Sequence, residues 1–414
     1  MADVSVLDVR LYGEPIATLT HVAGDRTLFA FNEAYISDRA RPTLSLSFKD
    51  TLGGLIADFA PTRVRLLPVF ANLLPEGHMR TYLAERAGVN PQREFFLLWA
   101  LGRDLPGAIT VVPAEGHAWP PNVDDRFQEG AFQENDGDRL PTTALRFSLA
   151  GVQLKFSALQ EARGGLTIPA GGVGGSWIVK LPSREFAGVP ENEFSMMTLA
   201  RLIGMEVPPI ELLDPADIGN LPKGIGDLKG KALAIERFDR FPGGEAVQIE
   251  DFAQVFGVYP ADKYKRASYS NIAKVIGTEG TNADVAEFIR RLTFNTLIGN
   301  ADMHLKNWSL IYRDRRTASL APAYDFVSTV SYLPDAHAAL NFSRTKRFDG
   351  FTEDELSHLA GKALLSRRLV VDTALETVAL FHERWRKEKK HLPISSEVAA
   401  AVEKQLKTVP LAAR

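Results

Sequence analysis

The start of the chain alternates apolar and polar positions, which is the pattern of β-strands with one buried face. Val4–Leu11 and Glu14–Leu19 alternate in this way on either side of Gly13, so we predict a β-hairpin there. Residues 1–112 are predicted to form a small α+β unit. Its further elements are strands at Leu28–Phe31 and Gly107–Val112, and helices from Pro75 to about Gly88 and at Glu94–Leu101.

The alternating pattern stops between Pro113 and Pro141. This segment is rich in Pro, Gly, Asp and Glu and poor in aliphatic residues, a composition typical of linkers and surface excursions. We therefore predict that residues 113–141 link two units. Strand patterns return over residues 142–238, and residues 239–414 are mainly helical. The helices predicted there are Ile249–Phe256, Val285–Ile298, Glu353–Leu365, Val370–Lys390 and Ser395–Leu406.

The composition is ordinary for a globular protein, with 414 residues, 45% hydrophobic and 24% charged, which leaves room for two or three domains. No apolar run reaches the roughly 18 residues that span a bilayer, and Met1–Arg10 lacks a signal-peptide pattern. We therefore expect a cytoplasmic location and no membrane partner. The absence of cysteine excludes disulfides and thiolate zinc sites. The formal charge of −3 gives no general attraction to nucleic acid.

The candidate chemistry is concentrated in Ile298–Ser309 and in Asp325. Asp302 and Asn307 are five positions apart, and Asp325 follows a short strand predicted at Trp308–Tyr312. Phosphoryl transfer uses these groups, because one carboxylate orients the attacking hydroxyl while an amide and a second carboxylate hold Mg²⁺. The spacing is that of protein-kinase catalytic and metal loops, without the usual His-Arg before the first Asp. The alternative is a loop in which Asp and Asn only cap turns.

Two upstream strands supply further kinase-like groups. Lys180 ends the apolar strand Ser176–Leu181, as does the strand lysine that holds ATP phosphates in kinases. Glu193 begins a helical stretch and is a candidate partner for Lys180, although a Glu at a helix N-terminus also suits the helix dipole. A later strand ends at Glu236–Asp239, where a hinge would offer backbone groups to an adenine beside Phe238. A plain edge strand explains the same residues.

A candidate phosphate loop precedes the lysine strand. Two alternating strands in Ala144–Leu159 flank Ala150 and Gly151, and Lys155 lies just beyond the turn. Small residues let backbone N–H groups approach an anion, but a glycine that only permits a β-hairpin fits this pattern equally well.

Taken in order, the motifs predict an α+β, two-lobed protein-kinase-like fold. Its N-terminal lobe is β-rich and its C-terminal lobe is mainly helical.

A known family shares these motifs in the same order. They are Leu101–Ala108, Arg146–Lys155, Ile178–Pro182, Glu236–Arg240, and the Asp302–Asn307 loop with Tyr324-Asp325. With them the chain resembles, over nearly its full length, the HipA serine/threonine kinase toxins of bacterial HipBA toxin–antitoxin modules. The resemblance implies the HipA-like form of the two-lobed fold and the use of ATP and Mg²⁺.

The resemblance also implies a role for each matching residue. Asp302 would orient the substrate hydroxyl and accept its proton, with His304 and Lys306 near the transferred phosphoryl group. Asn307 and Asp325 would bind Mg²⁺. The implied ATP contacts are the phosphate loop with Ala150, Gly151, Val152, Gln153 and Lys155, then Lys180 and His304 at the phosphates, Glu236 and Phe238 at the adenine, and Asp239 at the ribose.

Regulation and partners follow from the same resemblance. Ser148 would be the autophosphorylated serine, and its phosphate would add negative charge beside a loop that holds phosphate. The partners would be a HipB-like antitoxin dimer and operator DNA bound mainly through it, so that the complex corepresses its operon. The protein substrate would be an aminoacyl-tRNA synthetase, especially the glutamyl enzyme, whose phosphorylation stalls translation and growth.

Two other functions stay open at this point. A small-molecule phosphotransferase also carries Asp…Asn and a later Asp, but the Ser148 loop and the Leu101–Ala108 motif argue against it. A catalytically silent corepressor that binds HipB is the second, and the complete set of catalytic residues argues against it. The basic run Arg384–Lys390 would suit a DNA contact, but a solvated helix end explains it and is favoured.

Overall fold

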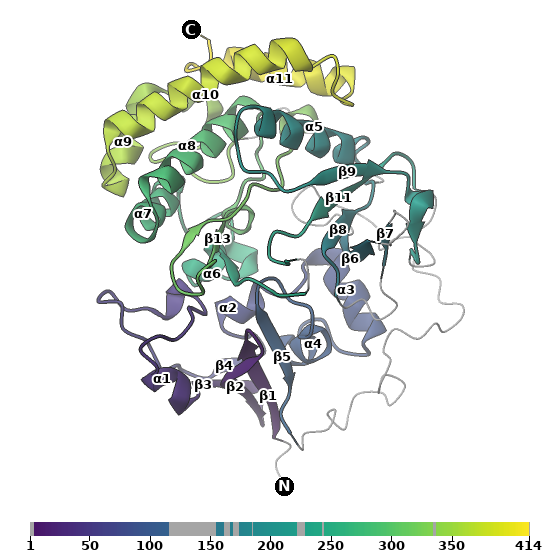
Figure 1. Cartoon of the computed structure of the whole chain (residues 1–414), viewed down its shortest axis with the longest axis vertical. Coiled ribbons are helices and arrows are strands. Elements are labelled where there is room, and N and C mark those ends of the chain that lie inside the picture. Colours follow the sequence, from purple (N-terminus) through teal and green to yellow (C-terminus); the bar gives the residue numbers. More distant parts are fainter. Residues whose placement is uncertain are drawn as a thin grey trace.

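A computed structural model of the chain describes residues 4–115, 155–160, 166–168, 174–183, 185–221, 228–241, 244–333 and 337–413. In Figure 1 the N-terminal unit lies at the bottom, a second sheet lies above it to the right, and a helical lobe with the C-terminus lies at the top. In the part of the chain that is described, no helix is long and apolar enough to cross a membrane.

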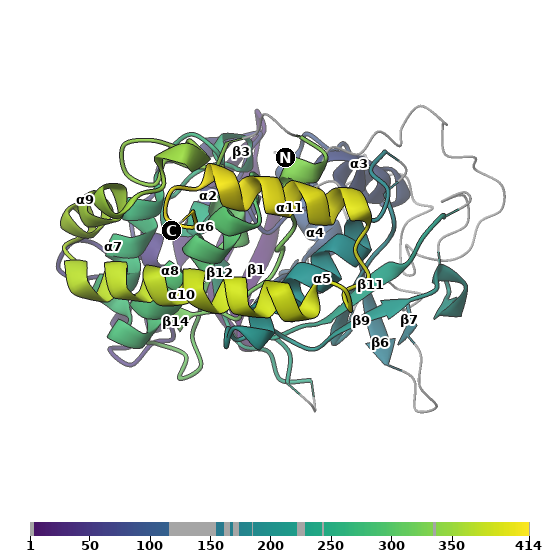
Figure 2. The same ribbon diagram turned by 90° about the horizontal axis from the view of Figure 1, so that it is seen from above.

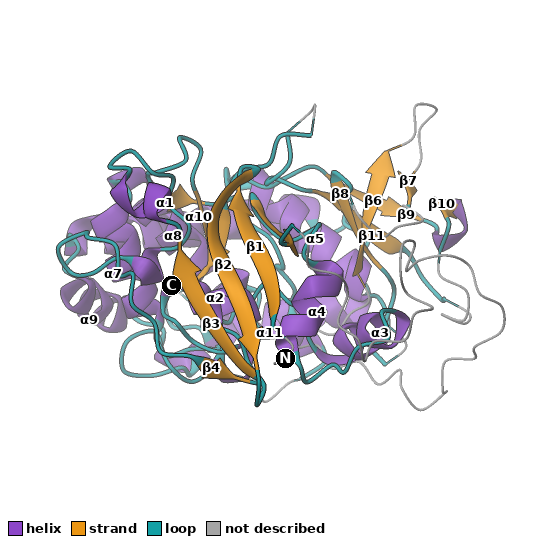
Figure 3. Cartoon of the chain, turned by 90° about the horizontal axis from the view of Figure 1, so that it is seen from below, coloured by secondary structure: helices purple, strands orange, loops and turns teal. Residues whose placement is uncertain are grey.

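The N-terminal unit is built on an antiparallel sheet with the strand order β4-β3-β2-β1-β5 (Figure 3). The predicted hairpin is confirmed, because β1 pairs with β2 around Gly13 and buries alternate residues. Phe29 packs against other aromatic rings in the core of this unit. The elements are β1 Ser5–Leu11, β2 Glu14–Val22, β3 Arg26–Phe31, β4 Thr62–Arg63, β5 Ile109–Pro113, α1 Glu33–Ser37, α2 Pro68–Ala71, α3 Gly77–Arg86 and α4 Glu94–Leu101.

A second sheet has the order β10-β7-β6-β8-β11-β9. Its pairs are antiparallel except for β7 and β10. Helix α5 (Val189–Leu202) packs against β9 and β11, so the lysine strand β8 lies close to the acidic start of this helix. The strands are β6 Lys155–Gln160, β7 Leu166–Thr167, β8 Trp177–Lys180, β9 Ile210–Leu213, β10 Ile218–Gly219 and β11 Ala232–Glu236.

The last part of the chain is a helical lobe whose long helices α10 and α11 lie over α8 (Figure 2). Side-chain caps fix several helix starts, as at Ser268 before α7 and Thr281 before α8. The elements are α6 Phe252–Val255, α7 Tyr269–Glu279, α8 Asn282–Leu297, α9 Glu353–Ala363, α10 Arg367–Glu388 and α11 Ser396–Thr408, with a small sheet of β12 Ile249–Asp251, β13 Ser309–Ile311 and β14 Ser319–Leu320.

One helix prediction is wrong in part. Ile249–Phe256 was expected to be helical, but Ile249–Asp251 forms β12 and only Phe252–Val255 is α-helix. The backbone of β12 pairs with β13, and Asp251 then caps α6. The hydrophobic pattern cannot distinguish these outcomes in so short a run, because the partner strand lies much later in the sequence.

Buried polar contacts join the N-terminal unit to the helical lobe. The Glu250 carboxylate, 1% exposed, accepts hydrogen bonds from Ser45 Oγ (2.6 Å) and Leu46 N (2.8 Å) of the N-terminal unit, and from the Tyr312 hydroxyl. Asn72 Nδ2 donates to Val258 O over 2.7 Å. Such groups lose water on burial and must find partners in the protein, so these contacts fix how the two parts sit together.

Removing the Glu250 carboxylate is expected to destabilise the whole fold. In Glu250→Ala, Leu46 N and the buried Tyr312 hydroxyl would lose their acceptor, and Ser45 Oγ would keep only Ser47 Oγ as a partner, which costs about 3 kcal/mol of unfolding free energy. Urea unfolding followed by circular dichroism measures the loss. Asp372→Ala, which removes an exposed ion pair with Arg368, is the control that leaves the midpoint unchanged. A Glu250→Ala midpoint equal to that of the control would contradict this prediction.

Candidate active site

The segment with Asp302 and Asn307 forms a tight loop between α8 and β13. After α8 the chain turns at Gly299 with φ +67°, and a Cβ added there would meet Val330 at 2.5 Å. A glycine is therefore required at this turn. Asn307 Nδ2 donates to the backbone oxygen of Asp302 over 2.9 Å, so the loop itself brings these two residues together.

The buried Asn300 connects this loop to the segment of Asp325. Its side-chain amide donates to the backbone oxygen of Asp325 over 3.2 Å, and its side-chain oxygen accepts from Asp302 N over 3.0 Å. Asp325 has φ +58°, a left-handed conformation that is uncommon outside glycine. Asn300 therefore stabilises an unusual backbone turn at the predicted metal ligand. No local sequence pattern marks Asn300 for this role.

The Asp302 carboxylate accepts a hydrogen bond from the Tyr264 hydroxyl. Burial raises the pKa of Asp302 to about 7, although the Tyr264 hydrogen bond opposes this shift. His304 Nε2 lies 3.9 Å from the same carboxylate, and the His304 ring packs edge-on against Tyr264 with 4.9 Å between centroids. Asp302 is therefore poised to exchange a proton near neutral pH.

Lys180 lies between two carboxylates from different parts of the chain. Its Nζ is 2.6 Å from Glu193 Oε1 on α5 and also bonds to the Asp325 carboxylate. Burial would raise the pKa of Asp325, but the Lys180 ammonium outweighs burial and lowers that pKa to about 2. The two carboxylates in turn raise the pKa of Lys180. The strand lysine, the helix glutamate and the later aspartate thus meet in one place.

Lys155 lies directly opposite Lys180 on the neighbouring strand, because β6 and β8 pair in that register. The charge of Lys155 also contributes to the lowered pKa of Asp325. Two cations therefore lie next to each other where the phosphate groups of a nucleotide are predicted. The rest of the predicted phosphate loop, with Ala150, Gly151, Val152 and Gln153, and the predicted phosphorylation site Ser148 lie outside the described residues.

The predicted hinge residues lie at the end of β11. The backbone N–H of Glu236 donates to Pro209 O over 2.9 Å. The half-buried ring of Phe238 packs against Tyr324 with 5.8 Å between centroids, next to Asp325. Phe238 therefore lies against the segment that carries the predicted metal ligand. The adenine contacts themselves stay a prediction.

The prediction that Asp239 reaches a ribose is not supported by its position. Asp239 is 4% exposed, and its carboxylate accepts hydrogen bonds from Arg237, Arg240 and the backbone N–H of Gly107. Arg237 also pairs with Asp104 over 3.0 Å. The motifs Leu101–Ala108 and Glu236–Arg240 therefore bind each other, and Asp239 holds the N-terminal unit to the hinge.

Glu76 brings the N-terminal unit into the candidate active site, which the sequence did not predict. Its carboxylate lies 2.6 Å from Lys306 Nζ and 2.8 Å from Lys263 Nζ. Tyr264, next to Lys263, contacts Asp302 as described above. No local sequence pattern marks Glu76 or Tyr264, because each reaches the site only through the tertiary fold.

The donor groups fit a magnesium nucleotide. A carboxylate and an amide oxygen, from Asp325 and Asn307, are ligands that Mg²⁺ accepts. His304 is 3% exposed, and neither of its ring nitrogens has a hydrogen-bond partner among the described residues. Burial lowers the pKa of His304 to about 3, so the ring is neutral at physiological pH. A buried neutral imidazole with free nitrogens next to the catalytic loop suits a polar ligand there.

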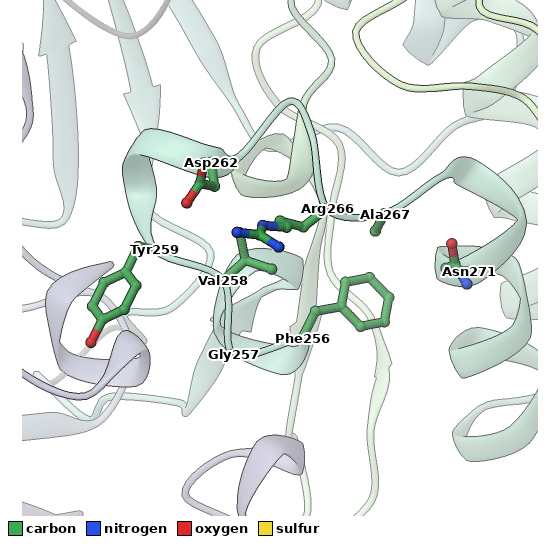
Figure 4. Close-up of a pocket in the computed structure, with 8 residues that line it drawn as sticks. All are labelled: Phe256, Gly257, Val258, Tyr259, Asp262, Arg266, Ala267 and Asn271. Carbon is green, nitrogen blue, oxygen red and sulfur yellow. The ribbon is translucent and has the colours of Figure 1, made fainter.

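A separate surface pocket of about 440 Å³ lies in the helical lobe (Figure 4). Phe256 and Arg266 contribute to its wall, and none of the predicted nucleotide-binding residues lines it.

The basic run Arg384–Lys390 is a surface feature, since Lys387 pairs with Glu383 and Lys389 pairs with Glu403. These pairs favour the solvated helix end over a DNA contact.

Comparison with known proteins finds matches to both halves of the chain. A family model described as the HipA N-terminal domain matches residues 7–112, and one described as the HipA-like C-terminal domain matches residues 147–401. The protein Y4dM of Sinorhizobium fredii, whose name marks it as a kinase candidate, is 59% identical over 414 residues, which cover 99% of this chain and 98% of that protein.

More distant proteins are also similar. The serine/threonine-protein kinase toxin HipA of Shewanella oneidensis is 28% identical over 289 residues, or 63% of this chain and 62% of that protein. Among solved structures, the complex of HipA, HipB and operator DNA from Shewanella oneidensis MR-1 matches with a TM-score of 0.71 and 22% identity, covering 98% of this chain and 96% of that chain. The predicted kinase-like α+β fold of the HipA type is confirmed by this likeness.

Removing the Lys180 charge is expected to lower the free energy of unfolding, and to lower it more at high pH than at low pH. In the native chain, the lowered pKa of Asp325 contributes stability above about pH 4 that is lost as the pH falls toward 2. In Lys180→Met, Glu193 and Asp325 lose their shared cation, so the pKa of Asp325 rises, and the pKa of Glu193, which burial already raises to about 7 in the native chain, rises further. Stability is then lost as the pH rises, by about 3–5 kcal/mol once both are ionised.

Urea unfolding at pH 5 and pH 8 measures this effect, and the loss should be larger at pH 8. The matched control is Lys231→Met, which removes an exposed pair with Asp214 and should change stability little at either pH. An equal loss for Lys180→Met at the two pH values would contradict the assigned ionisation of this site.

Proposed function

The chain belongs to the HipA family of toxin–antitoxin kinases, and we propose that it is an ATP- and Mg²⁺-dependent serine/threonine protein kinase. The observation that carries this proposal is the Lys180 ammonium bonded to both Glu193 and Asp325, next to the Asp302–Asn307 loop. Protein kinases require this lysine–glutamate pair together with a metal-binding aspartate.

The proposed mechanism gives each residue one task. Asp302 orients the substrate hydroxyl and takes its proton, and the Tyr264 hydrogen bond on one carboxylate oxygen leaves the other for the substrate. Lys180 and Lys155 bind the nucleotide phosphates. Asn307 and Asp325 would hold Mg²⁺, which would neutralise the charge on those phosphates.

The groups nearest the transferred phosphoryl would be Lys306 and His304. The Lys306 ammonium would neutralise charge that develops during transfer, and the neutral His304 ring would donate or accept a hydrogen bond. Glu236 and Phe238 would hold the adenine at the hinge, while Ala150–Gln153 would bind phosphate oxygens through backbone N–H groups. Preorganised groups of this kind supply most of the catalysis in phosphoryl transfer.

We further propose the family's regulation for this chain. Autophosphorylation of Ser148 would place about two negative charges beside the phosphate loop and so disable ATP binding. The solved relative is a complex with HipB and operator DNA, which supports a HipB-like antitoxin and corepression of the operon as partners and role here. The proposed target is an aminoacyl-tRNA synthetase of the glutamyl type, in the cytoplasm.

The deciding experiment is incubation of the chain with labelled ATP, Mg²⁺ and cell lysate, followed by mass spectrometry. We expect phosphoserine on Ser148 and on a synthetase, and no transfer by Asp302→Asn, in which the base is lost while antitoxin binding is kept. Transfer only to a sugar or an aminoglycoside would instead identify a small-molecule phosphotransferase. Antitoxin binding without any transfer would identify a corepressor.

Tyr264→Phe is expected to shift the pH dependence of transfer. The lost hydrogen bond stabilises the ionised form of Asp302, so its pKa rises and the acid limb of the rate–pH profile moves up by about one pH unit. The rate therefore falls more at pH 6 than at pH 8.5. Tyr82→Phe, which removes a hydroxyl that bonds to Arg86 in the N-terminal unit, is the control. A uniform fall at all pH values would refute the proposed role of Tyr264.

A further inference from the structure

The Glu76 carboxylate connects the N-terminal unit to two lysines of the helical lobe. Glu76 lies between α2 and α3, and its Oε2 is 2.8 Å from Lys263 Nζ, 187 residues later in the chain. Its Oε1 is 2.6 Å from Lys306 Nζ in the candidate catalytic loop. The side chains of Lys263 and Lys306 are only 7% and 14% exposed, so water screens these ion pairs poorly.

The N-terminal unit also supplies the second partner of Lys306. The ammonium donates to the backbone oxygen of Asn72 over 3.0 Å. Asn72 is itself fixed, since it is 5% exposed and its side chain donates to Pro68 O and Val258 O. An ammonium has three N–H donors. With two of them directed at Glu76 and Asn72, the direction of the third is set.

The charges of this cluster are well defined. Burial would raise the pKa of Glu76, but Lys306 and Lys263 outweigh it and lower that pKa to about 2. The carboxylate is therefore ionised at neutral pH, and the cluster of two ammonium groups and one carboxylate keeps a net positive charge. Lys263 contributes to lowering the pKa of Asp302 and Glu76 contributes to raising it, so the cluster acts directly on the proposed base.

We propose that Glu76 is a positioning residue of the kinase centre, holding the Lys306 ammonium so that its remaining N–H faces the transferred phosphoryl group. The inference rests on the proposed kinase function and adds that the N-terminal unit is part of the catalytic machinery. Bridging two lysines needs both oxygens of a glutamate. A glutamine presents an NH₂ group to one of the ammonium groups, and an aspartate is one methylene shorter.

The test is single-turnover autophosphorylation with Mg²⁺-ATP, followed by intact-protein mass spectrometry over a range of ATP concentrations. In Glu76→Gln we expect the maximal rate to fall by about 10- to 100-fold, because a group misplaced by about 1 Å at a reacting centre can cost about 100-fold. The ATP concentration at half-maximal rate should change less than about twofold, because Lys180 and Lys155 bind the other phosphates. Asp25→Asn, which breaks an ion pair with Arg93 inside the N-terminal unit, is the matched control and keeps the native rate.

A double-mutant cycle separates positioning from a merely structural role. If Glu76 acts through Lys306, then Glu76→Gln should cause no further loss in a Lys306→Met background. Losses that multiply in the double variant would overturn the proposal, and so would a native rate for Glu76→Gln. If Glu76→Gln unfolds at the assay temperature, Glu76→Asp replaces it in the same cycle with the same expected result.

The outcome for the native chain keeps the two proposals distinct. A native chain that transfers no phosphate to itself or to lysate proteins would overturn the kinase proposal and, with it, this role of Glu76. An active native chain whose rate does not depend on Glu76 would overturn the role of Glu76 alone.

Discussion

The arrangement of the candidate site depends on one buried cation. The Lys180 ammonium bonds to Asp325, 145 residues away in sequence, and to Glu193 on α5. A buried charge is tolerated only when it is paired, so this lysine ties the second sheet, α5 and the Asp325 segment to one another. Through Asn300 the same constraint extends to the loop of Asp302. The position of the proposed base is thereby linked to a strand in the other lobe.

A second constraint is the polar character of the contacts between the N-terminal unit and the rest. Glu250, Asp239 and Gln254 are buried, and each is bonded across this boundary. Hydrogen bonds and ion pairs have strict requirements for distance and direction, so such a boundary defines one relative placement of the two parts. Because this placement is fixed, the Glu76 carboxylate lies within ion-pair distance of two lysines of the helical lobe.

Local sequence signals predicted most of the elements and the residues that carry the chemistry. The helix Glu94–Leu101 was predicted with the bounds it has, and Lys180 lies, as expected, at the end of its strand. What the sequence could not show depends on tertiary contact. Strand β12 looked helical because its partner β13 is remote, and Asp239 looked like a ligand residue because its buried partners Arg237 and Gly107 cannot be seen from local pattern.

The bonds between the motifs Leu101–Ala108 and Glu236–Arg240 limit which N-terminal units could replace the one in this chain. Two guanidinium groups, of Arg237 and Arg240, share two carboxylates, and one of these, Asp104, belongs to the N-terminal unit. A chimera that grafts an N-terminal unit lacking this acid would leave the hinge with surplus buried positive charge. In this chain the N-terminal unit and the hinge are thus not independent modules, and a graft would keep the hinge paired only when the incoming unit carries an acid at the position of Asp104.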